Sequence, residues 1–193
     1  MNILYIHGWG SSFDPHSEKS LSLAQIGNVY GIDLDYTQPL NTTINLVLTA
    51  LTVNDIDLVV GTSMGGYMAN LIGNKYSIPY VMINPAIDPA TTLSRYAGHG
   101  YDFNGNSYNL SHAAITQYPE MSMSGNQAPA LLLLDMADEL LDPSLVINLV
   151  RNSSTITTHT WEGGSHRFDH MDDALDTIRT FDNTNSSYGF GDN

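Results

Sequence analysis

The sequence contains no cysteine and very little positive charge. Among its 193 residues, 6 are Lys or Arg and 20 are Asp or Glu, giving a formal net charge of −14. Without Cys, disulfides, thiolate nucleophiles and Cys-based zinc sites are excluded. The negative charge argues against a broad basic surface that would bind nucleic acid or an anionic membrane. It also mildly disfavours highly anionic substrates, unless the few Lys and Arg residues cluster locally.

Long apolar runs are missing as well. The chain begins without the basic start and apolar run of a signal peptide, and no stretch has the length and hydrophobicity of a membrane span. We therefore expect a cytoplasmic protein with no membrane partner. The hydrophobic fraction of 42% and the chain length predict a single globular domain with a sizeable core.

Short apolar runs alternate with helical patterns along most of the chain. This order is typical of an α/β fold in which a mainly parallel sheet of about six strands carries helices on both faces. The predicted strands cover residues 3–6, 29–34, 57–60, 80–83, 130–134 and 155–161. The predicted helices begin near Pro15, at a cap formed by Asn41 or Thr42, near Met64, at Pro143 and near His170, and the last one ends near Phe181.

Two segments do not follow this alternation. Residues 88–128 contain several Gly and Tyr with weak periodicity, and we expect them to form a small irregular cap or insert above the sheet. Residues 183–193 are polar and Gly-containing and are predicted to be a flexible tail. Residues 1–182 then form the α/β domain.

In a parallel α/β sheet, the functional site lies beyond the carboxyl ends of the strands. The loops that meet this condition are 7–12, 61–66, 84–90, 135–142 and 162–170. The residues with suggestive chemistry should therefore be sought in these five loops.

Ser63 is the candidate nucleophile. It occupies the run Gly61-Thr62-Ser63-Met64-Gly65, which follows an apolar strand and precedes a helical pattern. A Gly-x-Ser-x-Gly turn between strand and helix projects a serine hydroxyl above the sheet. A plain packing turn or a phosphate loop are the other interpretations. A phosphate loop would place Lys after the glycines, where this sequence has Gly66 and Tyr67.

His166 is the candidate base for this nucleophile. It lies directly after the last predicted strand, in Glu162-Gly163-Gly164-Ser165-His166, so the histidine comes last in chain order as in other hydrolases with this turn. His170 is the close competitor, although it more simply lines the last helix. The pair has the spacing of metal ligands but lacks an evident third ligand, so we predict no metal and no cofactor. His7 is expected to orient the loop that follows it.

Asp138 is the candidate orienter of the base. It lies four residues beyond the Leu131–Leu134 strand, far enough into the loop to turn toward His166. Asp142 and Asp135 remain alternatives. Asp142 precedes Pro143 and suits a helix N-cap, while Asp135 is close enough to the strand end to cap the turn.

Two backbone N–H groups are candidates for an oxyanion hole. Met64 opens the helix after the nucleophile, and Trp9 follows the first strand within His7-Gly8-Trp9-Gly10. Donors from these two places are the ones that hydrolases with a nucleophile elbow use. The side chains of Trp9 and Tyr67 are predicted to contribute to substrate binding.

With these residues in place, the chain resembles the YqiA-like esterases, a compact branch of the α/β-hydrolase superfamily. The resemblance covers most of residues 2–181. It rests on His7-Gly8-Trp9, the Ser63 run through Tyr67, Asn84-Pro85-Ala86, Asp138-Glu139-Leu140-Leu141-Asp142 and Glu162-Gly163-Gly164-Ser165-His166. It implies that Ser63, Asp138 and His166 form the triad and that the reaction needs no cofactor. This sequence departs from the family by having Ala137 where Gly is usual before the Asp.

The sequence therefore predicts a serine hydrolase that cleaves a small carboxylic ester through an acyl-enzyme. A thioesterase acting on an acyl-CoA-like substrate, or another acyl hydrolase on the same triad, is the first alternative. A hydrolase-shaped binding protein without turnover is the second. We expect a monomer or a small homo-oligomer.

Overall fold

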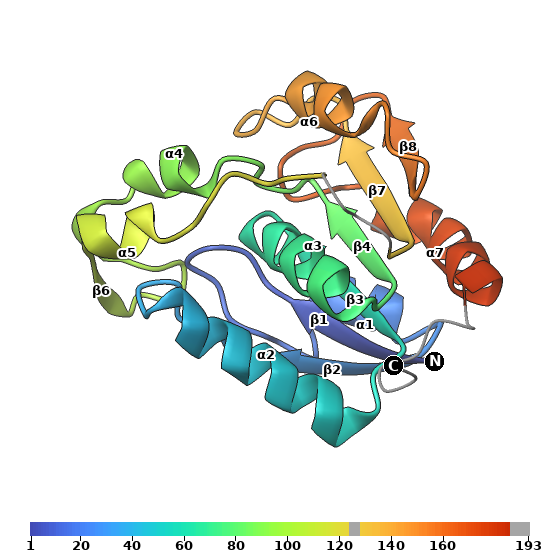
Figure 1. Ribbon diagram of the computed structural model, residues 1–193, viewed down its shortest axis with the longest axis horizontal. Coiled ribbons are helices and arrows are strands. Elements are labelled where there is room, and N and C mark those ends of the chain that lie inside the picture. The colour runs from blue at the N-terminus through green and yellow to red at the C-terminus, as the bar shows by residue number, and fades with distance from the viewer. Residues whose placement is uncertain (124–127, 186–193) are drawn as a thin grey trace.

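The computed structural model describes residues 1–123 and 128–185, and its centre is a six-stranded sheet (Figure 1). All neighbouring strands pair in parallel, in the order β2-β1-β3-β4-β7-β8. The strands are β1 (Asn2–Ile6), β2 (Asn28–Ile32), β3 (Leu58–Thr62), β4 (Tyr80–Ile83), β7 (Ala130–Asp135) and β8 (Ile156–Trp161). The predicted parallel sheet of about six strands is confirmed.

The central strands are buried on both faces. Every residue of β3, β4 and β7 is buried, as expected for parallel strands covered by helices on each side. The chain order reverses between β1 and β3, because β2 lies on one side of β1 and all later strands lie on the other. A site is expected at the carboxyl ends near such a reversal.

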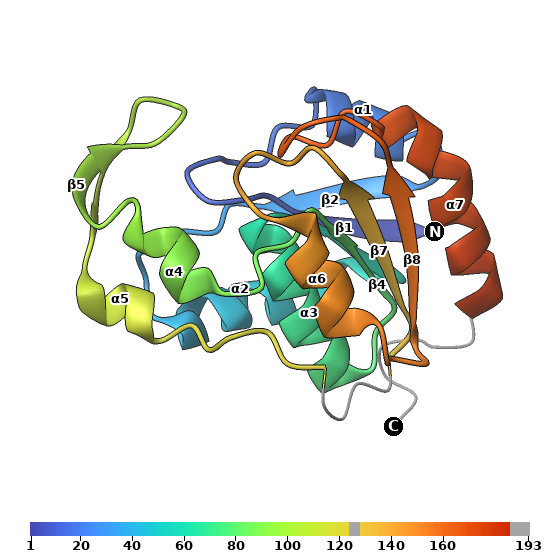
Figure 2. The same cartoon turned by 90° about the horizontal axis from the view of Figure 1, so that it is seen from above.

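Helices cover both faces, as predicted (Figure 2). The first layer contains α2 (Leu40–Asn54), α3 (Met64–Tyr76) and α6 (Pro143–Val150), which pack into the larger apolar cluster. The second contains α1 (Glu18–Leu23) and α7 (Met171–Asn185), which contact each other over the opposite face. Among the described residues, no helix combines the length and hydrophobicity needed to cross a membrane.

Two helix starts differ from the prediction. Helix α1 begins three residues after Pro15, because the Ser17 side chain accepts a hydrogen bond from the Ser20 N–H and caps the helix there. Leu21 on this helix is 54% exposed. Helix α2 begins at Leu40 without a side-chain cap from its own turn. Its first N–H instead donates to the side chain of Gln117, a partner 77 positions away that local sequence does not reveal.

The segment expected to be irregular contains regular structure. It forms α4 (Pro89–Ser94), the antiparallel hairpin of β5 (Gly98–Tyr101) and β6 (Ser107–Leu110), and α5 (His112–Thr116). These elements have four to six residues each, too few for periodicity to identify them. They project from one end of the sheet (Figure 2). Residues 124–127 of the expected cap lie outside the described residues.

The last helix extends past its predicted end. Helix α7 continues through Asn185, so residues 183–185 of the predicted tail are helical. The side chains of Thr180, Thr184 and Asn185 each donate to the carbonyl group four residues earlier. These bonds give the polar side chains hydrogen-bond partners within the helix. The rest of the predicted tail, residues 186–193, lies outside the described residues.

Candidate active site

Ser63 occupies a sharp turn between β3 and α3. Its backbone has φ 57° and ψ −118°, a strained conformation for a residue with a side chain. Two glycines leave room for this turn. A Cβ atom on Gly61 would lie 2.0 Å from the Gly65 carbonyl oxygen, and one on Gly65 would lie 2.0 Å from the Ile6 carbonyl oxygen. The Gly-x-Ser-x-Gly spacing is therefore required by how closely β1, β3 and α3 approach each other.

Ser63, His166 and Asp138 form one hydrogen-bonded chain. The Ser63 Oγ lies 3.0 Å from His166 Nε2, and His166 Nδ1 lies 2.8 Å from Asp138 Oδ2. An ionised carboxylate only accepts hydrogen bonds, so the proton of the neutral imidazole is on Nδ1. His166 Nε2 is then free to accept the proton of the serine hydroxyl. The arrangement can activate Ser63 as a nucleophile.

The side chains of the three residues are shielded from solvent to different degrees. The His166 side chain is 17% exposed, that of Asp138 only 1%, and Ser63 is buried. The other oxygen of Asp138, Oδ1, accepts the N–H groups of Leu140 and Leu141 at 2.8 and 2.9 Å. Asp138 therefore holds its own loop with one oxygen and His166 with the other.

The two alternative carboxylates have other partners. Asp142 is the N-cap of α6 and accepts the Ser144 N–H, and its hydrogen bonds to Ser144 lower its pKa below the ordinary value. Asp135 is fully buried and pairs with His170, with Oδ1 at 2.6 Å from Nδ1. Neither contact involves the imidazole of His166.

The two predicted oxyanion donors belong to segments that adjoin Ser63. Met64 is the first residue of α3, where the helix leaves its N–H groups without intrahelical acceptors and directs its partial positive charge toward the site. On the other side, a Cβ atom on Gly8 would lie 3.2 Å from the Ser63 Cβ and 3.7 Å from its Oγ. The Gly8–Trp9 segment thus runs directly beside the serine.

The Trp9 side chain joins this loop to the cap. Its ring packs edge-on against Tyr108 of β6, with centroids 5.1 Å apart. It also packs against Tyr96 in a tilted arrangement, with centroids 5.6 Å apart. A cavity of about 280 Å³ opens beside it. The cavity lining combines Trp9 and Gly10 with the segment after β2 and the hairpin, including Asp35, Asp102 and Tyr108.

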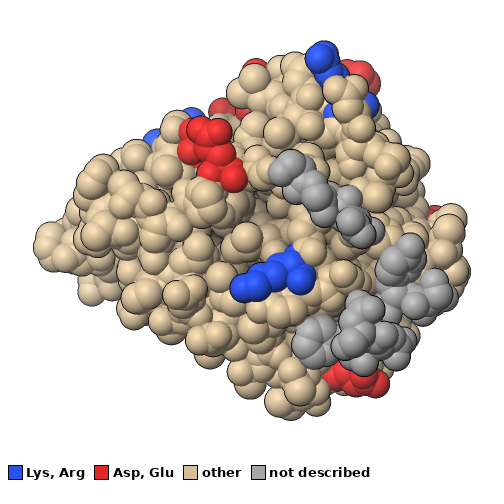
Figure 3. Space-filling view, in the orientation of Figure 1, with Lys and Arg blue, Asp and Glu red and all other residues tan. Residues whose placement is uncertain are grey.

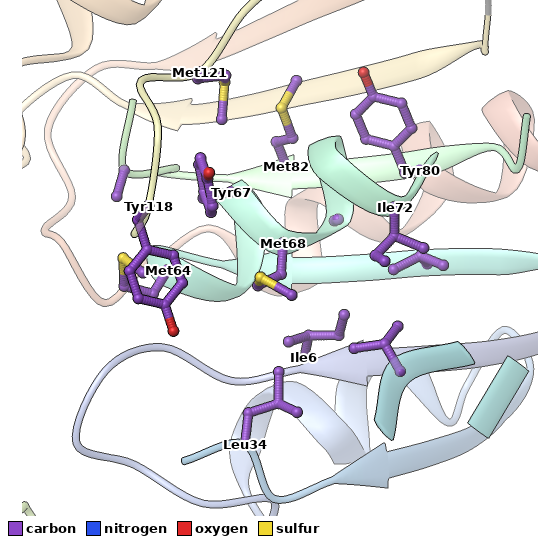
Figure 4. Packing of buried hydrophobic residues seen from close by; sticks show 14 of the residues in the cluster. Ile6, Leu34, Met64, Tyr67, Met68, Ile72, Tyr80, Met82, Tyr118 and Met121 are labelled. Carbon is purple, nitrogen blue, oxygen red and sulfur yellow. The ribbon is translucent and has the colours of Figure 1, made fainter. Parts of the chain in front are cut away.

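Tyr67 lies one helical turn beyond Ser63 but is only 1% exposed. Its ring packs against Tyr118 at 6.2 Å, and Figure 4 shows Met82 and Met121 beside it. Its hydroxyl is buried and has no hydrogen-bond partner among the described residues, and burial raises its pKa well above the ordinary value. In this conformation, substrate does not reach the Tyr67 ring from solvent. A role of Tyr67 in substrate binding stays a prediction.

His7 has the orienting contacts expected of it. Its Nε2 accepts the Leu34 N–H at 2.9 Å, and its Nδ1 lies 2.8 Å from the Gly8 carbonyl oxygen. A backbone N–H only donates, so Nδ1 carries the proton of the neutral ring. Burial lowers the His7 pKa, which favours this neutral form. His7 therefore fixes the loop that leads to Trp9.

Asn84 is a site residue whose role the sequence did not indicate. It is buried, with φ 41°, and its Nδ2 donates to the carbonyls of Ser165 and His166 at 3.0 and 3.3 Å. The position follows β4 within a loop already selected by topology, but an Asn-Pro pair usually indicates only a turn.

Within residues 1–123 and 128–185, no group of three or more His, Asp or Glu side chains is arranged to hold a metal ion. In particular, His166 and His170 do not converge on a common point. Their Nδ1 atoms bond to different carboxylates, Asp138 and Asp135. The contacts of these histidines are those of two separate Asp–His pairs.

Sequence comparison identifies relatives of this chain along nearly its whole length. The model of an uncharacterised protein family, UPF0227, matches residues 2–183. The UPF0227 protein VP0969 of Vibrio parahaemolyticus is 26% identical over 192 residues, covering 94% of this chain and 99% of the relative. The UPF0227 protein YcfP of Escherichia coli is 25% identical over 186 residues, covering 93% and 97%.

Structural comparison finds similar folds among hydrolases. Est1E of Butyrivibrio proteoclasticus, solved with ferulic acid bound, has a TM-score of 0.78 at 13% identity, over 96% of this chain and 89% of that one. Mouse alpha/beta hydrolase domain-containing protein 10 has a TM-score of 0.74 at 16% identity, over 95% and 90%. A monoacylglycerol lipase from Paleococcus ferrophilus has 0.69 at 14%, over 97% and 95%. The chain has the α/β-hydrolase fold.

Proposed function

The chain belongs to the UPF0227 family, and from this premise and its site we propose that it is a serine esterase that cleaves small carboxylic esters. The observation that carries the proposal is the continuous chain of hydrogen bonds from Ser63 through His166 to Asp138. It lies at the carboxyl ends of parallel strands, with a strained serine at the start of a helix. Each feature is typical of serine hydrolases built on a nucleophile elbow.

In the first half of the reaction, Ser63 Oγ attacks the ester carbonyl carbon while its proton passes to His166 Nε2. Asp138 stabilises the resulting imidazolium through Nδ1. The carbonyl oxygen becomes an oxyanion that accepts hydrogen bonds from the Trp9 and Met64 N–H groups. The tetrahedral intermediate then collapses. Its bond to the alcohol oxygen breaks, and His166 gives its proton to the leaving alcohol.

In the second half, water replaces the alcohol. His166 removes a proton from the water as its oxygen attacks the acyl carbon bound to Ser63. The same two N–H groups hold the new oxyanion. The Ser63 Oγ–carbon bond breaks, the proton returns to Ser63, and the carboxylic acid leaves. All proton transfers in this cycle take place among Ser63, His166, the leaving alcohol and the attacking water. The proposed cycle uses no cofactor and no metal.

The rival activities share this triad and differ in substrate. A thioesterase would attack a thioester carbonyl in the same way, but an acyl-CoA carries several negative charges and this protein has a net charge of −14. That charge opposes the approach of polyanions and favours a neutral ester. We propose a small acyl ester as the substrate. We also propose that the protein is a monomer or a small homo-oligomer and that it is located in the cytoplasm.

The proposal is tested by replacing Ser63 with Ala and assaying short p-nitrophenyl esters. We expect kcat to fall by at least about 10³-fold, because the nucleophile is lost while the remaining site stays intact. Ser94→Ala is the matched control, since Ser94 is exposed in α4 and bonds only to its own helix backbone. A fluorophosphonate probe should label the wild-type protein and Ser94→Ala, but not Ser63→Ala. Equal turnover by a folded Ser63→Ala variant would refute the assignment. A wild-type protein that the probe does not label would favour the non-catalytic alternative.

A further inference from the structure

A second Asp–His pair lies under the loop that carries His166. His170 Nδ1 is 2.6 Å from Asp135 Oδ1, the Asp135 side chain is fully buried, and that of His170 is 25% exposed. The His170 ring stacks on Trp161, with centroids 5.9 Å apart and planes 14° apart. The proposed acyl transfer does not use this pair. A buried carboxylate is nevertheless unfavourable unless hydrogen bonds compensate it, so its partners indicate what it does.

Within the described part of the chain, the hydrogen-bond partners of the Asp135 carboxylate are all in the loop around His166. Its Oδ2 accepts the Ser165 N–H at 3.2 Å and the Asp169 N–H at 2.7 Å, while Oδ1 faces His170. The donors therefore come from both sides of His166 in the chain. One buried carboxylate holds the loop before and after the base.

The loop lies against Asp135 too closely for an ordinary residue at one position. Gly164 has φ 71°, and a Cβ atom there would lie 2.0 Å from Asp135 Oδ2. Phe168 also has a positive φ, 65°, which is strained for an aromatic residue. It is 2% exposed and packs edge-on against Trp161. These close contacts restrict the conformations that the loop can adopt.

Asn84 completes the connection to the sheet. Its Oδ1 accepts the Asp135 N–H at 3.0 Å, and its Nδ2 donates to the carbonyls of Ser165 and His166. It thereby joins the carboxyl end of β4, the end of β7 and the backbone of the base itself. The His166 N–H donates to Glu139 Oε2 at 3.0 Å, so the main chain of His166 is held at both its N–H and its C=O.

We propose that Asp135, together with His170 and Asn84, forms a positioning network that fixes the imidazole of His166 between Ser63 and Asp138. The inference rests on the proposed function, because it assigns these residues to the same reaction. The network acts through His166 and touches no substrate. Its effect follows from geometry, since misplacing a catalytic group by about 1 Å lowers the rate by roughly 10²-fold.

Asp135→Asn tests the network with almost no change of volume. An amide has one acceptor oxygen and one donor nitrogen, so the two side-chain positions that bond His170 Nδ1 and the Ser165 and Asp169 N–H groups are no longer both acceptors. We expect kcat on p-nitrophenyl esters, and the rate of fluorophosphonate labelling of Ser63, to fall roughly 10- to 100-fold. KM should change by less than about threefold, because substrate contacts are preserved. In the proton NMR spectrum, the downfield resonance of the His166 Nδ1–H should broaden or change its chemical shift.

Ile178→Val is the control for loss of stability alone. Ile178 is a fully buried residue of α7, about two helical turns beyond His170, and packs in the second apolar cluster. Both variants are assayed well below their melting temperatures, and Ile178→Val should keep the wild-type labelling rate and His166 resonance. At position 170, Gln retains an N–H donor for Asp135 and Ala does not. His170→Gln should therefore recover most of the activity that His170→Ala loses.

The outcomes separate the two proposals. If wild-type protein is labelled and turns over esters, but Asp135→Asn keeps its kcat and its His166 resonance, the positioning network is overturned. The positioning network is also overturned if His170→Gln and His170→Ala are equally active. These two His170 variants decide whether the network exists if Asp135→Asn does not fold. If wild-type protein has no Ser63-dependent activity, the proposed function fails, and the His166 resonance in wild type and Asp135→Asn still decides whether Asp135 positions the ring.

Discussion

Four carboxylates in one loop show how neighbouring residues of the same type acquire different tasks. Asp135 is buried against the base loop, Asp138 bonds to the imidazole of His166, and Asp142 caps α6. Glu139 holds the His166 N–H. The difference lies in the donors that each oxygen meets, since the four side chains share nearly the same acidity in water.

Replacing Asp138 and Asp142 separately should distinguish these tasks. Asp138→Asn keeps the size of the side chain but removes the charge that stabilises the imidazolium and fixes its tautomer. We expect kcat to fall roughly 10³- to 10⁴-fold with little change in KM. Asp142→Asn changes a helix cap to another good capping residue, and Asp142→Ala removes the cap. Asp142→Ala should lower the free energy of unfolding, because the Ser144 N–H loses its capping acceptor.

The two readouts are steady-state ester hydrolysis and denaturant unfolding. Asp142→Ala should retain wild-type kcat at a temperature where it is fully folded. An activity loss in Asp142→Ala comparable to that in Asp138→Asn would contradict the assignment of Asp138 as the orienting acid.

Single residues also show where prediction from sequence ends. Ser63, His166 and Asp138 were assigned because their positions in chain order and after strands restrict the possibilities. Tyr67 is buried against Tyr118 in this structure, and its contribution to substrate binding stays a prediction. The contacts of Asn84 join residues more than 50 positions apart, and a local pattern carries no signal of such a contact.

At the scale of elements, the connection from β3 to α3 determines the geometry of the nucleophile. The helix begins immediately after Ser63, and Gly65 lies in its first turn against the end of β1. The apolar run before the serine and the helical pattern after it were sufficient to predict this unit. The short elements of the cap were not predictable in the same way. A helix of five or six residues has less than two turns, and a strand of four residues places only two side chains on each face, so neither gives a clear periodic pattern.

Gly65→Ala should therefore damage the site through the element rather than through a side chain. The new Cβ would lie 2.0 Å from the Ile6 carbonyl oxygen, so α3 has to move away from β1. We expect stability to fall by about 3 kcal/mol or more and Ser63 labelling to become slower. Thermal unfolding and the labelling rate of the remaining folded protein measure the two effects.

An Ala substitution at Thr52 provides the comparison. Thr52 is exposed on α2, and its hydroxyl bonds only to the Leu48 carbonyl of its own helix. That variant should have nearly wild-type stability and labelling. Gly65→Ala behaving like Thr52→Ala would show that β1 and α3 do not approach as closely as described.

At the scale of the whole molecule, the dominant property is the net charge of −14. Figure 3 shows that charged groups are sparse over the face that carries α2 and α3. Two of the six basic residues, Arg95 and Arg167, are on segments beside the site: Arg95 Nη1 donates to the Leu140 carbonyl, and Arg167 follows the base. Acidic Glu139 and Asp169 are present on the same loops. The sequence predicts the overall charge balance, but only the fold shows which charges are neighbours: the charges of Arg167, Asp169 and Asp135 all act on Lys19.

This balance predicts how substrate charge and salt affect the reaction. Three acetate esters of similar size, with a cationic, a neutral and an anionic alcohol, should be compared at about 10 mM and 150 mM salt, where the Debye length shortens from roughly 30 to 8 Å. Electrostatic attraction raises the local concentration of the cation and lowers that of the anion. We therefore expect kcat/KM to fall with salt for the cationic ester, to rise for the anionic one and to stay nearly constant for the neutral one.

The same measurement separates the ester and acyl-CoA alternatives. A short acyl-CoA should be hydrolysed less efficiently than the same acyl group on a small neutral thiol, and added salt should narrow the difference, because screening weakens repulsion of the CoA phosphates. The neutral thioester serves as the control for intrinsic reactivity of the thioester bond. A clear preference for acyl-CoA that persists at low salt would contradict the prediction. It would show that the positive charges of Arg95 and Arg167 outweigh the field of the whole protein at the site.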